Sequence, residues 1–198
     1  NASNYIDKLV ISTDGEEIME VARTYGCDVP FKRPDELSND TATSVDVVIH
    51  TIQMLEQDFD YILLLQPTSP LRTAIDIDNA IVQFVSSGVS SLISVTKAKE
   101  SPYAIHTIKN NTLKPLINTE KKPHRRQDGP DYYVVNGAIY LIETDVLMSE
   151  KSFLQSDTQV FIMPRSRSID LDTEQDFQYL EYIIGLNLKE NKNSNTRN

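Results

Sequence analysis

The sequence predicts a three-layer α/β domain, in which helices cover both faces of a mostly parallel sheet. In the first half of the chain, short apolar runs typical of strands alternate with longer segments whose apolar residues recur at helical spacing. This alternation is typical of a parallel sheet covered by helices. The stretch Tyr61–Leu65 (YILLL) supports the same fold, because a continuous apolar run predicts a strand buried on both faces.

Local signals define the elements of the first half. The predicted strands are Leu9–Thr13, Asp28–Phe31, Tyr61–Leu65 and Ser91–Thr96. Thr13 and Glu16 have the spacing of a capping box, which predicts a helix that continues through Tyr25. Gly26 stands where such a helix is expected to stop.

Two more helices are predicted before residue 90. Apolar residues repeat at helical spacing over residues 45–55, which predicts the second helix. Thr73 and Asp76 form another capping-box pattern ahead of an apolar periodic run, and Gly88 ends the third helix.

The second half of the chain predicts an insertion and a closing helix. Its predicted elements are the strands Tyr103–Ile108, Tyr132–Ile142 and Val160–Met163, and a last helix capped by Thr173 and Asp176. Residues 110–131 are polar, basic in the middle and interrupted by prolines, so we expect an arm outside the main sheet. We expect one domain over residues 1–186. The polar stretch 187–198 predicts a disordered tail or a solvated helix end.

Composition limits the classes of partner. The 198 residues carry 19 Lys and Arg against 29 Asp and Glu, a formal charge of −10, which argues against nucleic acid. A few local arginines can still hold an anionic small molecule. The single cysteine, Cys27, allows no internal disulfide and fits a reducing cytoplasm. Neither a membrane-spanning apolar run nor a signal-peptide pattern is present in the sequence, so no membrane partner is predicted.

The loop that follows Tyr61–Leu65 is the first candidate site. Gln66, Thr68 and Ser69 bring hydrogen-bonding side chains, two prolines fix the backbone, and Arg72 adds a permanent positive charge. Ligands of open α/β sheets bind at the carboxyl ends of the strands. We therefore expect this loop to form the floor of a binding site rather than a merely stiff connection.

Asp170 and Asp172 are the second candidate site. Residues two apart on an extended segment point to the same side, so the two carboxylates are expected together. Two neighbouring like charges are costly unless a cation lies between them, and Mg²⁺ prefers such oxygen ligands. The alternative is that Asp172 stabilises a helix N-terminus and Asp170 is merely solvated. The spacing alone does not choose between the two.

Three weaker patterns accompany these sites. The adjacent arginines Arg125 and Arg126 are suited to binding carboxylate or phosphate. Arg33 and Ser44 lie eleven residues apart across a turn-rich loop. The glycine in VNGAIY, Val135–Tyr140, predicts a bulge or a close backbone approach within a strand.

Taken together, these motifs resemble the CMP-sialic acid synthetases (acylneuraminate cytidylyltransferases) and their bacterial relatives that act on other nonulosonic acids. The segments that carry the resemblance run in the family's order: ISTDGEEI, VPFKRPDELSNDTATS, LLQPTSPLR, RRQDGP, NGAIY and SIDLDTEQDF. They cover nearly the whole chain. The resemblance implies a Rossmann-like nucleotidyltransferase domain with a small dimerisation arm.

The resemblance also implies a reaction and a cofactor. The family joins CTP to a nine-carbon 2-keto sugar acid, which gives a CMP-sugar and pyrophosphate. Such transfer depends mainly on positioning and on charge neutralisation. By resemblance, Asp170 and Asp172 would be the catalytic pair that holds Mg²⁺.

The same resemblance implies the substrate contacts. Arg33 and Ser44 match positions that face the cytosine and its ribose, and Gln66 and Thr68 match positions that bind the sugar acid. Arg126 and Tyr140 match the rest of that pocket. Arg72 is expected to have a structural role at the end of its loop. The basic arm resembles one that forms homodimers, with Arg125 and Arg126 directed towards the neighbouring subunit.

The sequence departs from the family pattern at two places. A strand and a glycine-rich, lysine-containing loop for the triphosphate usually open the family's sequences. We expect about 30 residues of this βα unit to be absent here, and the chain as written to catalyse poorly. Val134 occupies a position where many bacterial members have arginine, which leaves legionaminate or a related acid as open as N-acetylneuraminate.

Two other functions are compatible with parts of the sequence. A related sugar nucleotidyltransferase could use 3-deoxy-octulosonate or a sugar phosphate, but NGAIY with SIDLDTEQDF favours the sialic-type acid. A non-catalytic relative that binds a nucleotide or a partner would explain the absent loop. The presence of Asp170, Asp172, Gln66 and Arg126 argues against it.

Overall fold

The computed structural model describes residues 3–118 and 129–195. Its helices are α1 (Glu16–Thr24), α2 (Ser44–Leu55), α3 (Ala74–Ser87), α4 (Thr144–Glu150) and α5 (Glu174–Asn195). Its strands are β1 (Tyr61–Leu64), β2 (Ser91–Lys97), β3 (His106–Lys109), β4 (Thr112–Pro115), β5 (Tyr133–Glu143) and β6 (Gln159–Ile162). Within these ranges, no helix is both long and apolar enough to cross a membrane.

The main sheet confirms the α/β prediction and adds one reversed strand. Its order is β1-β5-β2-β6. β2 is parallel to β6, whereas β5 runs antiparallel to both β1 and β2. β1, β2 and β6 therefore share one direction, as a mostly parallel sheet requires. β5 opposes them because the chain enters it on its return from the arm.

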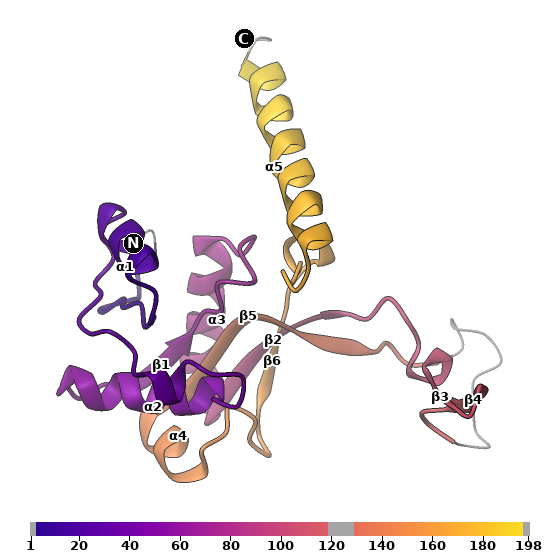
Figure 1. The fold of residues 1–198 in the computed structure, drawn as a ribbon, viewed down its shortest axis with the longest axis horizontal. Helices are drawn as coiled ribbons and strands as arrows, with labels where there is room; N and C mark the ends of the chain where they lie inside the picture. The colour runs from indigo at the N-terminus through magenta and orange to yellow at the C-terminus, as the bar shows by residue number, and fades with distance from the viewer. Residues whose placement is uncertain (1–2, 119–128, 196–198) are drawn as a thin grey trace.

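The core shows the three predicted layers, which are visible in Figure 1. Successive residues of a strand point to opposite faces. Accordingly, Leu92 of β2 and Leu141 of β5 pack in one cluster with Phe84 of α3. Their neighbours Ile93 and Ile142 pack on the other face, where α2 and α4 contribute the covering side chains.

The first strands are shorter than predicted. Leu9–Thr13 and Asp28–Phe31 meet through one parallel bridge, Val10 to Asp28, instead of forming full strands. Leu9 is 39% exposed, so the prediction that Leu9–Thr13 forms a buried strand is wrong. This region has a small cluster of its own, built around Met19, Ala22 and Val29. An apolar run forms a full strand only when a neighbouring segment pairs with it over several residues, and here a single bridge is the only pairing described.

Strand β1 is also less buried than its composition predicts. Tyr61 is 49% exposed, and the other residues of β1 are half-buried. Within the described part of the chain, β1 pairs with β5 along one edge, and its second edge has no ladder partner. An edge strand is covered less completely than a central one, because the helices that cover the faces of a sheet pack mainly over its middle.

The helix ends test the capping predictions. Thr73 and Asp76 form the predicted capping box of α3, and Thr173 and Asp176 exchange the same hydrogen bonds at α5. The predicted box of Thr13 and Glu16 is wrong: Gly15 is the N-cap of α1. There the Thr13 hydroxyl accepts a hydrogen bond from the Gly15 amide.

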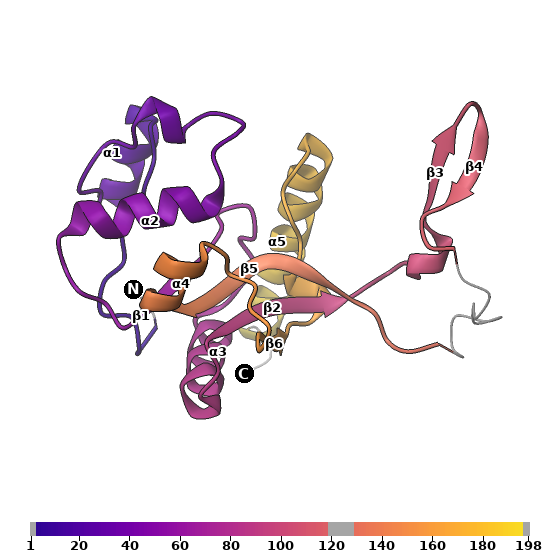
Figure 2. The ribbon, with the colours of Figure 1, turned by 90° about the horizontal axis from the view of Figure 1, so that it is seen from below.

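The arm leaves the sheet earlier than the predicted residue 110. The Ala98 amide donates to the Tyr132 carbonyl at 2.8 Å, and the chain between these residues departs from the sheet. It contains the β3–β4 hairpin, which lies well apart from the main sheet in Figure 2. At the base of the arm, the rings of Tyr103 and Tyr132 meet edge to face at 6.1 Å.

The C-terminal helix α5 extends away from the sheet in Figure 1. It continues to Asn195, so it includes most of the stretch for which composition predicted a disordered tail or a helix end. Leu180 is buried, whereas Phe177, Tyr179 and Tyr182 are exposed. The helix is therefore anchored through its first turns.

Candidate active site

The loop after β1 is held by a guanidinium group. Arg72 donates through Nη1 to the carbonyl oxygens of Gln66, Ser69 and Ala138, at 2.6, 2.8 and 3.3 Å. Burial lowers the pKa of Arg72 from its usual range. These bonds close the turn and tie it to β5. They fit the structural role expected of Arg72, because the guanidinium bonds backbone carbonyls of its own loop and of β5.

The predicted bulge in β5 lies directly against this loop. Ser69 is fully buried, and its hydroxyl donates to the Asn136 carbonyl at 2.9 Å. Gly137 has φ +70°, and a Cβ there would lie 2.7 Å from Gln66 Oε1 and 2.9 Å from Ser69 Oγ. The glycine therefore provides both a left-handed backbone and the room that the Gln66 side chain occupies.

The segment with Asp170 and Asp172 meets the same loop. The Leu171 amide donates to the Thr68 carbonyl at 2.9 Å, which joins the middle of SIDLD to the loop after β1. Tyr140 is half-buried; burial raises its pKa first, and the negative charge of Asp170 raises it further. The structure thus brings Gln66, Thr68, Tyr140 and the acidic pair to one edge of the sheet.

The two carboxylates suit a cation. Asp170 and Asp172 are exposed, and their side chains form no ion pair or hydrogen bond with another described residue. Within the described ranges, no cluster of three or more His, Cys, Asp or Glu residues could hold a metal. Two free carboxylate groups nevertheless fit Mg²⁺, which takes one or two carboxylates and completes its shell with water and substrate phosphates.

Arg33 and Ser44 lie on a different part of the fold. Arg33 donates through Nη2 to Asp14 at 3.0 Å and through Nε to Ser38 at 3.1 Å. Ser44 is the first residue of α2, after the N-cap Thr43. No described contact joins these two residues to the Gln66 loop or to the acidic pair. Arg125 and Arg126 lie outside the described residues.

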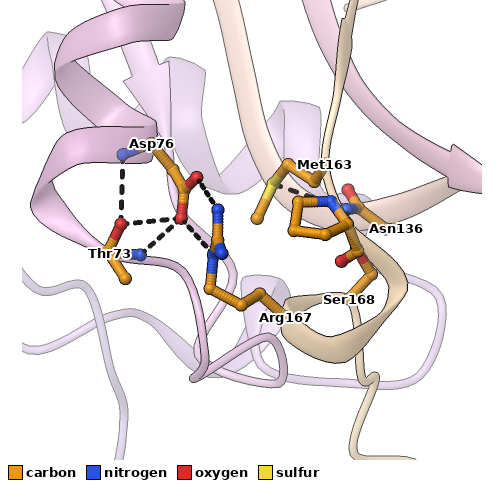
Figure 3. A network of polar contacts seen from close by, with 7 residues as sticks. Thr73, Asp76, Asn136, Met163, Arg167 and Ser168 are labelled. Atoms are coloured by element: carbon orange, nitrogen blue, oxygen red, sulfur yellow. Dashed lines mark hydrogen bonds and ion pairs between the residues drawn. The ribbon is translucent and has the colours of Figure 1, made fainter.

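Sequence reasoning missed the polar network behind the acidic segment. Arg167 pairs with Asp76 of α3, and Asn136 of β5 donates to Ser168, as Figure 3 shows. Asp76 was recognised only as a capping residue. The sequence contains one usable signal. Arg167 lies three residues before Asp170, and a cation so close to a candidate site can pair with a buried carboxylate such as Asp76.

A hollow of about 450 Å³ lies at the opposite end of β1 and β5. Asp58, Asp60, Glu143 and Asp145 are among the residues that line it. Four carboxylates would repel an anionic nucleotide. The hollow is therefore a poor candidate for the active site, and the edge with Gln66 and Asp170 remains the better one.

Comparison with solved structures first confirms the fold. The fold is similar to CMP:2-keto-3-deoxy-manno-octonic acid synthetase complexed with CTP, with a TM-score of 0.64 and 13% identity, over 95% of this chain and 83% of that one. It is also similar to 4-diphosphocytidyl-2C-methyl-D-erythritol synthase from Anaerococcus prevotii, with a TM-score of 0.63 and 11% identity, over 92% and 80%. The chain therefore shares the overall fold of these two proteins.

The family follows from the sequence match. Residues 1–195 match the cytidylyltransferase family, and the chain belongs to it. It is 32% identical to a post-translational flagellin modification protein B of Campylobacter coli, over 92% of this chain and 79% of that one. It is 31% identical to CMP-N,N'-diacetyllegionaminic acid synthase of Legionella pneumophila, over 93% and 81%. An N-acylneuraminate cytidylyltransferase of Streptococcus agalactiae is 32% identical, but the chain spans only 47% of its length.

Proposed function

We propose that this cytidylyltransferase joins CTP to a nonulosonic acid and releases a CMP-sugar and pyrophosphate. The observation that carries the proposal is the meeting of the Gln66–Arg72 loop, Tyr140 and the acidic pair at one sheet edge. The hydrogen bond from Leu171 to Thr68 joins two of these parts directly. Relatives named for legionaminic, neuraminic and pseudaminic acids support a nine-carbon sugar acid as the second substrate.

In the proposed reaction, the anomeric hydroxyl oxygen of the sugar acid bonds to the α-phosphorus of CTP. The bond from this phosphorus to the bridging oxygen breaks, pyrophosphate leaves with that electron pair, and the hydroxyl proton passes to solvent. Gln66 and Thr68 orient the sugar acid, and Tyr140 forms a wall of its pocket. Positioning of this kind can account for much of the rate in phosphoryl-type transfer.

Asp170 and Asp172 would hold Mg²⁺ through their free carboxylates. When bound, the ion supplies neutralisation of the triphosphate and polarisation of the α-phosphate. Arg33 and Ser44 are proposed to face the nucleoside, and Arg126 to contact the sugar acid or its carboxylate. Arg33 has donors for a base or a ribose, provided that it exchanges the exposed Asp14 for the ligand.

We further propose a homodimer that forms through the arm. Within the described part of the arm, several large apolar side chains are more than 40% exposed: Ile105, Ile108, Leu113, Leu116 and Ile117. Such a group fits an interface better than it fits water. Replacing Ile108 and Leu113 with Glu should give monomers in light-scattering measurements, whereas Val82→Glu on α3 should leave the mass unchanged.

The single, unpaired Cys27 fits the cytoplasm as the compartment of the enzyme.

The test is a pyrophosphate-release assay with CTP, Mg²⁺ and a panel of acids. N-acetylneuraminate, legionaminate, pseudaminate and 3-deoxy-octulosonate should be compared, with the 198-residue chain and with protein expressed from the complete reading frame. We expect turnover with at least one nonulosonic acid, and a loss of about 100-fold or more in Asp172→Ala. Turnover with 3-deoxy-octulosonate alone would change the substrate class. Failure with every acid would contradict the proposal.

A further inference from the structure

The acidic segment is held by side chains that the proposed reaction does not use. It runs from the 3-10 turn Arg165–Arg167 to the start of α5 at Glu174. Figure 3 shows that two neighbouring residues of the segment are bonded to two separate elements, Arg167 to α3 and Ser168 to β5. The aspartates follow two and four residues after Ser168.

The first of these contacts is a bidentate ion pair. Arg167 donates through Nε to Asp76 Oδ2 at 2.9 Å and through Nη2 to Oδ1 at 2.6 Å. Asp76 is only 4% exposed, and Oδ2 also accepts from the amide and the hydroxyl of Thr73 at 2.9 and 2.8 Å. One carboxylate therefore connects the acidic segment to the residue that directly follows Arg72.

Capping alone does not explain this pair. The described residues contain two other boxes of the same kind, Thr43 with Asp46 and Thr173 with Asp176. Neither of these carboxylates forms an ion pair with a described residue. A threonine and an aspartate are thus enough to cap a helix here, and the arginine at Asp76 has another role.

The second contact fixes the segment from the sheet. Asn136 is 4% exposed and donates through Nδ2 to Ser168 Oγ at 2.9 Å. Its Oδ1 accepts from Ser94 Oγ at 2.6 Å, so both ends of the amide are bonded. Ser168 in turn donates to the Pro164 carbonyl at 2.9 Å. The segment is therefore anchored on both sides before it reaches Asp170.

We propose that Arg167, through Asp76, is a positioning residue that sets the place of Asp170 and Asp172 against the Gln66–Arg72 loop. A segment already held in place loses less conformational freedom when its carboxylates bind a divalent cation. Mutation of groups that orient metal ligands commonly lowers metal affinity by about 10- to 100-fold. This inference rests on the proposed function, because it assumes that the two aspartates bind the metal.

The test measures metal binding directly, with Mn²⁺ in place of Mg²⁺ and free Mn²⁺ followed by electron paramagnetic resonance. We expect Arg167→Met to weaken Mn²⁺ binding about 10-fold, and Arg167→Lys, which keeps the charge without the fork, to fall between it and wild type. Asp157→Asn is the matched control, because Asp157 accepts hydrogen bonds from Ser90 at the other end of β2. It should bind Mn²⁺ like wild type.

A second readout separates positioning from general damage. In Arg167→Met, the Mg²⁺ concentration for half-maximal pyrophosphate release should rise, and saturating Mg²⁺ should restore most of the rate. Wild-type Mn²⁺ affinity in this variant would overturn the inference, while loss of binding in Asp172→Ala would leave the proposed metal site standing. Unchanged binding in Asp172→Ala would overturn both. If Arg167→Met does not fold, wild-type affinity in Arg167→Lys would overturn the inference by itself.

Discussion

Two aspartate–arginine pairs in this molecule differ in the burial of the carboxylate, and the difference separates the roles of the two arginines. In the pair of Asp76 and Arg167, the side chains are 6% and 38% exposed. In the pair of Asp14 and Arg33, they are 45% and 23% exposed. Both pairs connect segments that are distant in the sequence, but only Asp76 also bonds to a helix N-terminus.

The free energies involved explain what each arginine can do. Water reaches the carboxylate of Asp14, so its ion pair with Arg33 contributes little to stability, and Arg33 can exchange Asp14 for a ligand at small cost. Breaking a buried pair leaves a charge without a partner and is costly. Arg167 is therefore suited to holding structure, and Arg33 to binding. The protein places the first behind its acidic segment and the second on the proposed nucleoside side.

The largest expected effect comes from removing the buried carboxylate. Asp76→Ala should lower the free energy of unfolding by about 3 kcal/mol, because Arg167 and the first turn of α3 both lose their partner. Asp14→Ala, the exposed counterpart, should leave the urea midpoint almost unchanged. The measurement is urea denaturation followed by circular dichroism. Equal midpoint shifts in the two variants would remove the distinction between the pairs.

A somewhat smaller effect is expected at the bulge. Gly137→Ala should cost about 2 kcal/mol, from the left-handed backbone and from the contact with Gln66, and should raise the KM for the sugar acid. Gly88→Ala is the matched control, because Gly88 has φ +65° but open space around it. It should cost about 1 kcal/mol and leave the KM unchanged. A similar KM in both variants would show that Gly137 does not position Gln66.

The pH dependence of stability should reveal the same buried pair. Burial alone would raise the pKa of Asp76, but hydrogen bonds from Arg167 and Thr73 outweigh burial, and the pKa is lowered. The contribution of this carboxylate is therefore present above its unfolded pKa of about 3.9 and is lost as the pH falls through the lowered folded value. The stability difference between wild type and Asp76→Asn should shrink below about pH 4. A constant difference down to pH 2 would contradict this assignment.

The smallest expected effect is the difference in stability between substitutions in two capping boxes of the same composition. Thr73→Ala removes a hydroxyl that bonds to the buried Asp76 and should cost about 1 kcal/mol. Thr43→Ala removes the same hydroxyl from the exposed box of α2 and should have a smaller effect on the thermal midpoint. If Thr43→Ala were the more destabilising of the two, the buried network would not add to the cap of α3.

Sequence reasoning succeeded where the signal is local. Thr73 with Asp76, Gly88 at the end of α3 and the bulge at Gly137 were predicted because each depends on a few neighbouring residues. It failed for Thr13 with Glu16, where the same letters do not cap the helix, and for Leu9–Thr13, which lacks a full ladder. Both failures depend on partners that a local pattern does not contain.

By itself, the sequence determined the helices α1, α2, α3 and α5, the strands of the main sheet and the family, because periodicity, caps and motifs are written along the chain. It did not predict α4 or β4, and the site residues that it proposes stay predictions. Only the tertiary structure decided that β5 lies reversed between β1 and β2, and that Asp76 meets Arg167 across 91 residues. Ion pairs and strand neighbours of this kind depend on which distant segments share an edge. That choice is made by packing of the whole core, not by any one stretch of sequence.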